Sequence, residues 1–216
     1  MFDCVKRDLN RCGDRFSEQL REALLNPGTW AVLSYRLRRW AYTLRAPKAI
    51  RKLLGPLSST VQLCTVLATN IDLPVTAEIG PGLYIPHTGF IVVTVGAIIG
   101  SNCTLTQGVT IGHGRGGKRS DDGIPVIGDR VYVGPSSVVI GAITVGHDAL
   151  IGAGAIVIRP VPAGGVVVGN PARVISTHGS FDLISYPDML ADKSRAAAIA
   201  TLRSSEVESD GLPVSQ

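Results

Sequence analysis

The sequence predicts a mainly β fold, a left-handed parallel β-helix of hexapeptide repeats that follows an N-terminal α-helical region. The first observation behind this prediction is a six-residue period between Leu73 and Val174, in which an aliphatic residue followed by glycine recurs. The pairs are Ile79-Gly80, Ile99-Gly100, Ile111-Gly112, Ile127-Gly128, Val133-Gly134, Val145-Gly146 and Ile151-Gly152, and Leu73, Val93, Leu105, Val139 and Val157 fall on the same grid without the glycine. A period of six fits neither a helical turn of 3.6 residues nor the two-residue alternation of a strand, and it is typical of a β-helix.

The second observation is a set of small or β-branched residues four positions after most of these lead residues. They are Ala97, Cys103, Val109, Val131, Ser137, Ile143, Ala149 and Ala155. We expect both sets to point inward and stack from coil to coil, about eighteen residues per coil and roughly five coils in all. The glycines are expected at tight corners, where a positive φ costs little without a Cβ atom. A sandwich of short strands would place its turns every 8 to 12 residues, which does not match.

Three regions follow from this pattern. Residues 1–70 are predicted to be α-helical, residues 71–175 to form the β-helix domain, and residues 176–216 to form a C-terminal extension that is partly helical and then lacks packed structure. The expected helices are 17–25, 30–44 with Thr29 as its N-cap, 49–54 and 57–68 on either side of Gly55-Pro56, and a weak helix at 188–202. A stripe at helical spacing is predicted to pack against the rest of the protein, and its members are Trp30, Leu33, Leu37, Trp40 and Leu44.

Charge is unevenly distributed along the chain. Residues 1–60 contain 12 Lys and Arg against 5 Asp and Glu, whereas residues 61–216 contain 9 against 12. The basic helices suggest either an acidic partner, such as peripheral contact with an anionic membrane surface, or simply a solvated helical face. No apolar run is long enough for a transmembrane helix, and the N-terminal sequence lacks the apolar stretch of a signal peptide. The cysteines, Cys4, Cys12, Cys64 and Cys103, are widely spaced, so we expect reduced thiols and a cytoplasmic protein.

Two irregularities interrupt the six-residue period. The spacing from Ile85 to Val93 is eight, which places a two-residue insertion around residues 86–89. The spacing from Ile111 to Ile127 is sixteen, which places a ten-residue loop between them. This loop is rich in glycine and basic residues. Regular coils need no such loop, and loops on a rigid scaffold commonly carry function.

The histidines indicate where chemistry could take place. His87 opens the short insertion and His113 opens the long loop, whereas His147 and His178 are expected to lie on the surface. We interpret His87 as the functional base, although either loop histidine could instead be a hydrogen-bonded turn residue. A metal site would need about three converging ligands. The histidines contain no close pair, so no metal site is expected.

Three segments carry a resemblance to a known family: His-Thr-Gly at 87–89, Gln-Gly-Val-Thr-Ile-Gly at 107–112 and Gly-Asn-Pro-Ala-Arg-Val at 169–174. With these segments, residues 26–176 resemble the hexapeptide-repeat acyltransferases, and within them the serine O-acetyltransferase branch. The resemblance implies acetyl-CoA as co-substrate, no metal, and a homotrimer or a multiple of trimers with the acyl-CoA cleft between neighbouring prisms.

The resemblance also assigns roles to individual residues. It implies that His87 is the catalytic base, that Gln107 binds the acceptor substrate, and that the coenzyme lies along the loop and two later turns. The implied coenzyme-binding residues are Gly112, Gly114, Pro135 and Ala153, and the charges of Arg115, Lys118 and Arg119 suit the coenzyme's phosphates. Another branch of the family, the galactoside type, places its base near the start of the same loop, so His113 is a second catalytic candidate.

The sequence departs from the serine branch at two places. Pro86 stands where that branch usually has an aspartate, and Gly123-Ile124-Pro125 replaces a usual Arg-His-Pro. Because a zwitterionic substrate needs charged partners, these departures argue against free serine. The altered loop resembles that of acetyltransferases of surface polysaccharides, which implies an O-acetyltransferase that acts on a sugar or a surface-polysaccharide unit. The alternative is L-serine, with Asp121 or Asp122 supplying the missing groups.

Two other classes of protein remain open at this stage. A non-catalytic β-helix scaffold would not bind acetyl-CoA, and a metal-dependent hydro-lyase on the same prism would contain zinc or iron. In the favoured enzyme, histidine accepts the proton of the acceptor hydroxyl as that oxygen attacks the thioester, a contribution of about 10²–10⁴-fold in rate.

Overall fold

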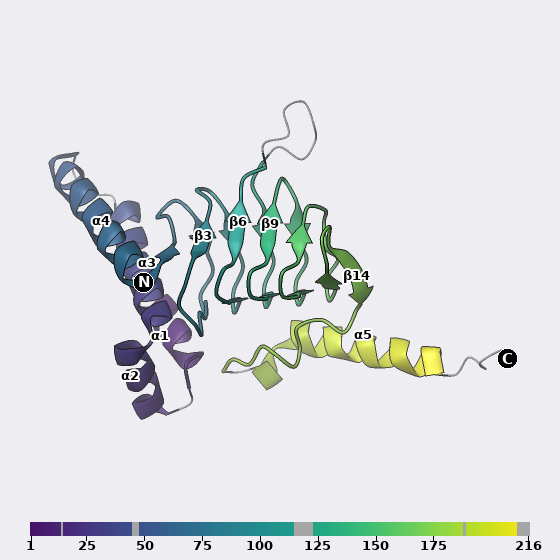
Figure 1. Cartoon of the computed structure of the whole chain (residues 1–216). Coiled ribbons are helices and arrows are strands. Elements are labelled where there is room, and N and C mark those ends of the chain that lie inside the picture. Colours follow the sequence, from purple (N-terminus) through teal and green to yellow (C-terminus); the bar gives the residue numbers. More distant parts are fainter. Residues whose placement is uncertain (14, 45–47, 115–122, 188, 211–216) are drawn as a thin grey trace.

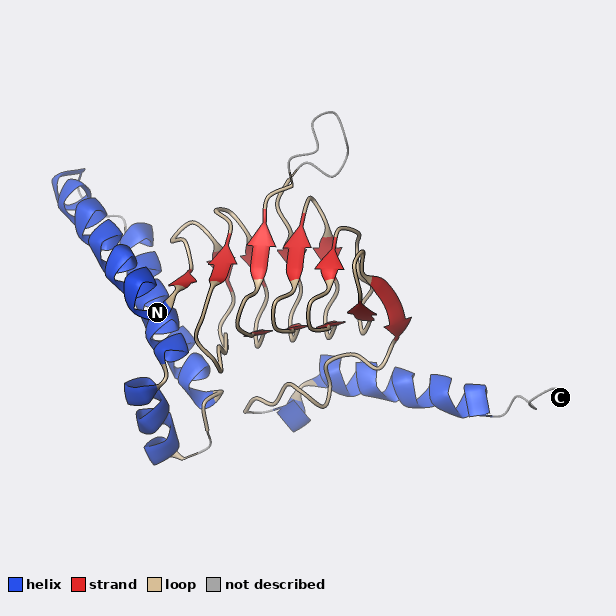
Figure 2. Cartoon of the chain, in the orientation of Figure 1, coloured by secondary structure: helices blue, strands red, loops and turns tan. Residues whose placement is uncertain are grey.

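The structure is a computed structural model that describes residues 1–13, 15–44, 48–114, 123–187 and 189–210. Five predicted site residues, Arg115, Lys118, Arg119, Asp121 and Asp122, lie outside the described residues. The described part forms a prism of stacked coils with a cluster of helices at its first coil and a C-terminal helix alongside (Figures 1 and 2). The predicted left-handed parallel β-helix is thus confirmed.

Three sheets form the long faces of the prism. The first sheet contains β1 (Ile71–Asp72), β3 (Ile91–Val93), β6 (Thr110–Gly112), β9 (Val138–Ile140) and β12 (Ile156–Val157). The second contains β2 (Glu78–Ile79), β4 (Ile98–Ile99), β7 (Val126–Ile127) and β10 (Thr144–Val145). The third contains β5 (Thr104–Leu105), β8 (Tyr132–Val133), β11 (Leu150–Ile151), β13 (Val166–Val168) and β14 (Arg173–Ser176). Neighbouring strands are parallel except for β13 and β14.

The strand register confirms the coil length and both insertions. Val93 pairs with Ile111, an offset of 18 residues. Ile79 pairs with Ile99 at an offset of 20, and Ile99 pairs with Ile127 at an offset of 28. The coil that contains residues 86–89 therefore has two extra residues, and the coil that contains the long loop has ten.

The core consists of the residues that the repeat predicts. All lead aliphatics and all the small residues at the fourth following position are buried. Cys103 is completely buried, and this burial raises the pKa of its thiol to about 12. It is therefore an inert core residue.

The predicted role of the repeat glycines is wrong. Gly100 does not have a positive φ; instead, a Cβ atom there would lie 2.5 Å from the backbone of Gly128 in the next coil. The left-handed residues come two positions later in the turns, and several are not glycine, including Asn102, Arg130, Ser136 and Asp148. The repeat glycines, such as Gly100, are required because neighbouring coils stack too closely to leave room for a side chain at these positions.

The helical region contains α1 (Phe2–Asn10), α2 (Phe16–Leu25), α3 (Pro27–Thr43) and α4 (Lys48–Thr69). It differs from the expectation in three ways. Residues 2–10 form a helix of their own. Asn26 rather than Thr29 is the N-cap of α3, since its side chain accepts a hydrogen bond from Gly28 N at 2.7 Å and proline occupies the first helical position. Pro56 lies inside a single helix instead of separating two.

The predicted packing stripe on α3 is wrong for three of its five residues, whereas Leu33 and Leu44 are half-buried. Trp30, Leu37 and Trp40 are 42–52% exposed, whereas the opposite face with Tyr35 and Arg36 is buried. That buried face packs against the open edge of the first coil. The carbonyl groups at this edge have no preceding strand that could donate hydrogen bonds to them.

Four side chains of α3 donate hydrogen bonds to this edge. The donors and acceptors are Tyr35 to Ala77 O, Arg36 to Ile79 O and Gly80 O, Arg38 to Leu73 O, and Arg39 to Val75 O. These basic residues therefore have a structural role that accounts for part of the positive charge of the N-terminal region.

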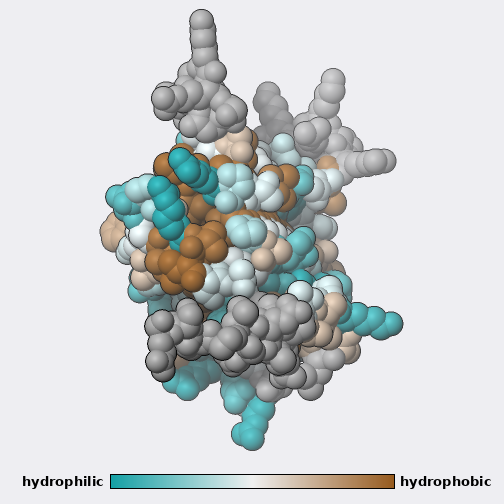
Figure 3. Space-filling model, turned by 90° about the vertical axis from the view of Figure 1, so that its right-hand side faces the viewer, coloured by the Kyte–Doolittle hydropathy of each residue, from teal (hydrophilic) through white to brown (hydrophobic). Residues whose placement is uncertain are grey.

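β14 covers the last coil where the β-helix domain meets the C-terminal extension, and Val174 and Ile175 of that strand remain exposed. Figure 3 looks onto this end of the molecule and shows a hydrophobic patch there. The chain then runs back beside the prism through a 3₁₀ turn, η1 (Met189–Ala191), into α5 (Lys193–Asp210), so the helix expected at 188–202 begins later and extends further. Among the described residues, no helix is long and apolar enough to cross a membrane.

Candidate functional site

Four of the predicted site residues lie on one edge of the prism, where the third sheet turns into the first. Backbone hydrogen bonds join the turns of successive coils along this edge: Gly108 N to Gly89 O at 2.9 Å, Ser136 N to Gln107 O at 2.9 Å and Gly154 N to Pro135 O at 2.8 Å. We call it the His87 edge; its turns are residues 86–90, 106–109, 134–137 and 152–155. His87, Gln107, Pro135 and Ala153 each lie in one of these turns, in successive coils.

The first turn of the His87 edge presents His87 to solvent. His87 and Thr88 are exposed and Pro86 is half-buried. Among the described residues, no hydrogen bond or ion pair involves the His87 side chain. The imidazole is therefore available to an incoming substrate, and Pro86 offers it no carboxylate.

Phe90 completes this turn and was not singled out from the sequence. It is 75% exposed and has a φ of 47°, a left-handed conformation that is uncommon for a bulky residue. Strained residues of this kind cluster at functional sites. The six-residue repeat carries no signal for Phe90, because this residue adjoins the two-residue insertion.

We expect Phe90→Gly to stabilise the fold by about 1 kcal/mol, because glycine adopts the left-handed conformation without the Cβ penalty. Phe90→Ala is the matched control, since it removes the same ring but keeps the strain. Chemical denaturation of both variants should therefore place the glycine variant about 1 kcal/mol above the alanine variant. Equal unfolding free energies for the two would show that the turn is not strained.

The second set of predicted residues lies on a different edge, where the first sheet turns into the second. Gly112 ends β6, and the exposed His113 follows it. Gly114 and Gly123 exchange two backbone hydrogen bonds of 3.0 and 3.3 Å, which close the base of the long loop. We call this the loop edge. Within one chain the first sheet separates it from the His87 edge, so the structure does not bring His87 and His113 together.

The other two histidines lie at the surface, as predicted. His147 is 60% exposed, and its Nδ1 atom accepts a hydrogen bond from Asp129 N at 2.9 Å. His178 is exposed beyond β14. Among the described residues, no group of three or more His, Cys, Asp or Glu side chains could hold a metal ion.

The coils and the His87 edge define a hexapeptide-repeat β-helix protein, and comparison with known proteins agrees. No protein-family model matches the chain. The serine acetyltransferase of Helicobacter pylori strain 26695 is 36% identical over 162 residues, which cover 71% of this chain and 84% of the relative. That of Synechococcus elongatus is 37% identical over 160 residues, covering 74% of this chain and 62% of the relative.

Solved structures give the same result. Serine acetyltransferase from Brucella abortus in complex with coenzyme A superposes with a TM-score of 0.69 at 30% identity, covering 81% of this chain and 67% of that one. The Neisseria gonorrhoeae enzyme in complex with serine superposes with a TM-score of 0.68 at 29% identity, covering 81% and 69%. The chain belongs to the serine acetyltransferase family. It spans 62% and 66% of the lengths of the Synechococcus and Mycobacterium tuberculosis relatives.

Proposed function

We propose that this protein transfers an acetyl group from acetyl-CoA to the hydroxyl group of L-serine. The observation that carries the proposal is the His87 edge, which aligns an exposed histidine with the turns of Gln107, Pro135 and Ala153 in successive coils. The solved relatives support both ligands, since one contains coenzyme A and another contains serine. From the sequence, a sugar was the predicted acceptor and L-serine was the alternative.

The reaction follows from the chemistry of the exposed imidazole. The acceptor hydroxyl oxygen attacks the thioester carbonyl carbon while His87 accepts the hydroxyl proton. The carbonyl oxygen becomes an oxyanion, which hydrogen-bond donors of the site would stabilise. When the intermediate collapses, the carbon–sulfur bond breaks, the coenzyme leaves as its thiol, and the imidazole returns the proton to the sulfur.

We further propose that the site lies between two chains. His87 and the base of the long loop lie on different edges of one prism. A cleft that contains both therefore requires the His87 edge of one chain to lie beside the loop edge of its neighbour. A closed ring of three chains provides this arrangement three times, since cyclic symmetry repeats one interface. Gly112 and Gly114 would then contact the coenzyme bound along the neighbour's Pro135 and Ala153.

Pro86 and Gly123-Ile124 replace groups that the serine branch usually has, so the test must compare L-serine directly with sugars. We expect release of free thiol from acetyl-CoA to depend on L-serine, with a specificity constant at least about tenfold above that for any sugar, because a site built for a polar substrate penalises analogues that leave its groups unpaired. The measurement is steady-state thiol release with L-serine, D-serine, a galactoside and a nucleotide sugar. A preference for either saccharide would reject L-serine as the acceptor, and the absence of acetyl-CoA binding would reject acetyl transfer altogether.

A further inference from the structure

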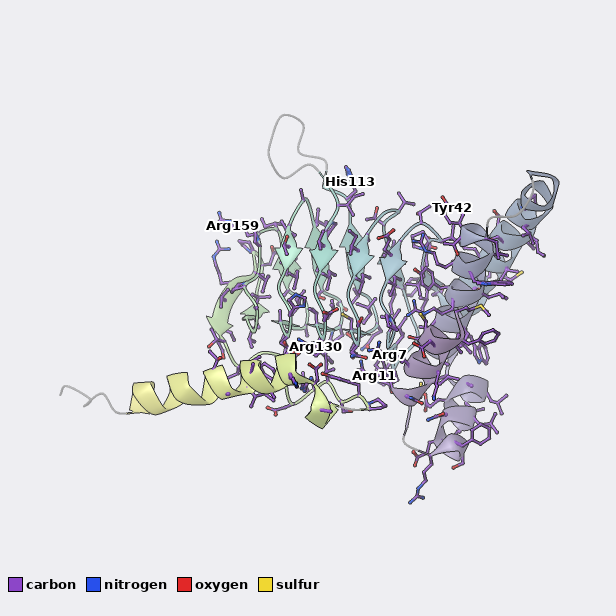
Figure 4. The ribbon with its side chains drawn as sticks, turned by 180° about the vertical axis from the view of Figure 1, so that it is seen from behind. Arg7, Arg11, Tyr42, His113, Arg130 and Arg159 are labelled. Atoms are coloured by element: carbon purple, nitrogen blue, oxygen red, sulfur yellow. The ribbon has the colours of Figure 1, made fainter. Side chains whose placement is uncertain are left out.

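A polar cavity of about 290 Å³ lies on the third edge of the prism, where the second sheet turns into the third. Its lining comes from distant parts of the chain: Arg7, Asn10, Asn102, Tyr186, Pro187, Ala191 and Asp192. We call it the arginine pocket. Figure 4 shows Arg7, Arg11 and Arg130 gathered on this side, with His113 on the opposite side of the prism. The pocket is thus separate from both the His87 edge and the loop edge.

Two arginines stand directly behind residues of the lining. Arg11 donates hydrogen bonds to Asn102 O at 2.6 Å, to Gly82 O at 3.1 Å and to Thr104 Oγ1 at 2.9 Å. Arg195 is only 2% exposed and lies 5.4 Å from the centre of the Tyr186 ring. It donates from Nη2 to the carbonyl oxygens of residues 181 and 184.

These two guanidinium groups are incompletely paired. Arg11 Nε and Arg195 Nε and Nη1 are buried without a hydrogen-bond acceptor among the described residues. A buried charged donor without a partner is costly, and such groups in native proteins call for a missing ion or water. Burial, with a smaller contribution from the nearby charge of Arg195, lowers the pKa of Arg11 to about 10. The local charge therefore favours a bound anion.

The nearby carboxylates are already engaged. Asp148 forms a double hydrogen bond with Arg130, with distances of 2.7 and 2.9 Å. Asp192 accepts hydrogen bonds from Ser194 and Tyr186, which keep its pKa well below the usual range, and it lies 3.5 Å from Arg130 Nη1. Arg7 lines the pocket, and Arg11, Arg130 and Arg195 each contact a lining residue. Against these four arginines stand two carboxylates, which leaves an excess of positive charge.

We propose that the arginine pocket binds a small oxyanion of the phosphate class, a site independent of acetyl transfer. The exposed Arg7 and the side-chain amides of Asn10 and Asn102 would donate to its oxygens, and the charges of Arg11 and Arg195 behind the lining would attract it. Guanidinium groups suit phosphate because their N–H groups match the spacing of its oxygens. The bound anion would join α1 to the C-terminal segment.

The test uses the full chain and inorganic phosphate, titrated by calorimetry at constant ionic strength with chloride as the replacement anion. Thermal unfolding is measured in parallel, because a ligand that binds only the folded state raises its stability. Ala191→Glu adds a carboxylate at an exposed lining position and should raise the apparent Kd about tenfold or more, whereas Arg7→Gln should raise it about three- to tenfold. Lys6→Gln is the matched control, since it removes an exposed charge from the same helix outside the lining, and it should leave the Kd within about twofold.

A second arm replaces inorganic phosphate with glycerol 3-phosphate, to distinguish a free ion from a phosphate ester. Saturable binding of either probe that is weakened by Ala191→Glu and not by Lys6→Gln supports the site, and the tighter probe identifies the source. Two results would overturn the proposal: no saturable effect of either probe on the unaltered protein, or the same affinity in all three variants. Neither result depends on whether the protein acetylates serine.

Discussion

His87→Ala should reduce the turnover number for acetyl transfer by about 10²-fold or more, because a general base lowers the barrier only while the proton moves. The side chain is exposed on the His87 edge and has no partner among the described residues, so its removal should leave the fold intact. The affinity for coenzyme A should change little, since proton transfer belongs to the transition state and not to the bound ground state. The expected signature is a loss of turnover without a loss of coenzyme binding.

The measurements are steady-state release of coenzyme A and calorimetric binding of the coenzyme. His147→Ala is the matched control, because it removes another exposed histidine whose visible contacts are to Asp129; it should keep full activity. His113→Ala should lose less than His87→Ala if it only lines the cleft. An inactive His113→Ala together with a near-normal His87→Ala would move the base to the loop edge, and full activity in both would refute histidine catalysis.

The β-helix was predictable because its determinants are local and repeated. Each coil needs inward-pointing aliphatic and small residues at fixed positions. The run from Ile99 to Cys103 has this pattern, and the following coils repeat it. The insertions were predictable for the same reason, since a regular repeat makes any extra residue visible. A coil of 18 residues, with two and ten residues added for the two insertions, gives the spacings between successive site residues. These spacings place four of them on one edge: His87, Gln107, Pro135 and Ala153.

The helical region was less predictable because its packing depends on distant parts of the chain. The hydrophobic pattern predicted that Trp30 and Trp40 would be buried. In the structure, the first coil presents a row of carbonyl groups to α3, and hydrogen bonds to these groups favour burial of Tyr35, Arg36 and Arg38 instead. The arginine pocket was missed for the same reason. Arg11 and Asn102 are 91 positions apart, and no local pattern connects them.

Asp8→Asn is expected to destabilise the protein by about 3–5 kcal/mol, because it leaves the charge of Arg36 buried without its partner. Asp8 is 4% exposed. Its carboxylate accepts hydrogen bonds from Arg36 Nε at 2.7 Å and from the backbone N–H groups of Gly82 and Leu83 at 2.7 and 2.9 Å. Burial alone would lower the pKa of Arg36, but the hydrogen bonds and charge of Asp8 outweigh burial and raise it. One carboxylate thus joins α1, α3 and the first coil.

Urea denaturation monitored by circular dichroism tests this expectation, with Asp3→Asn as the matched control. Asp3 is exposed on the same helix, so its substitution should change the unfolding free energy by no more than about 0.5 kcal/mol. A second variant, Asp8→Asn combined with Arg36→Met, removes both charges and should lose less than the sum of the two single substitutions, because neither charge is then left unpaired. If Asp8→Asn unfolds within 1 kcal/mol of the unaltered protein, or if the two substitutions are simply additive, the ion pair does not hold the helical region to the first coil, and the packing of α3 alone must do so.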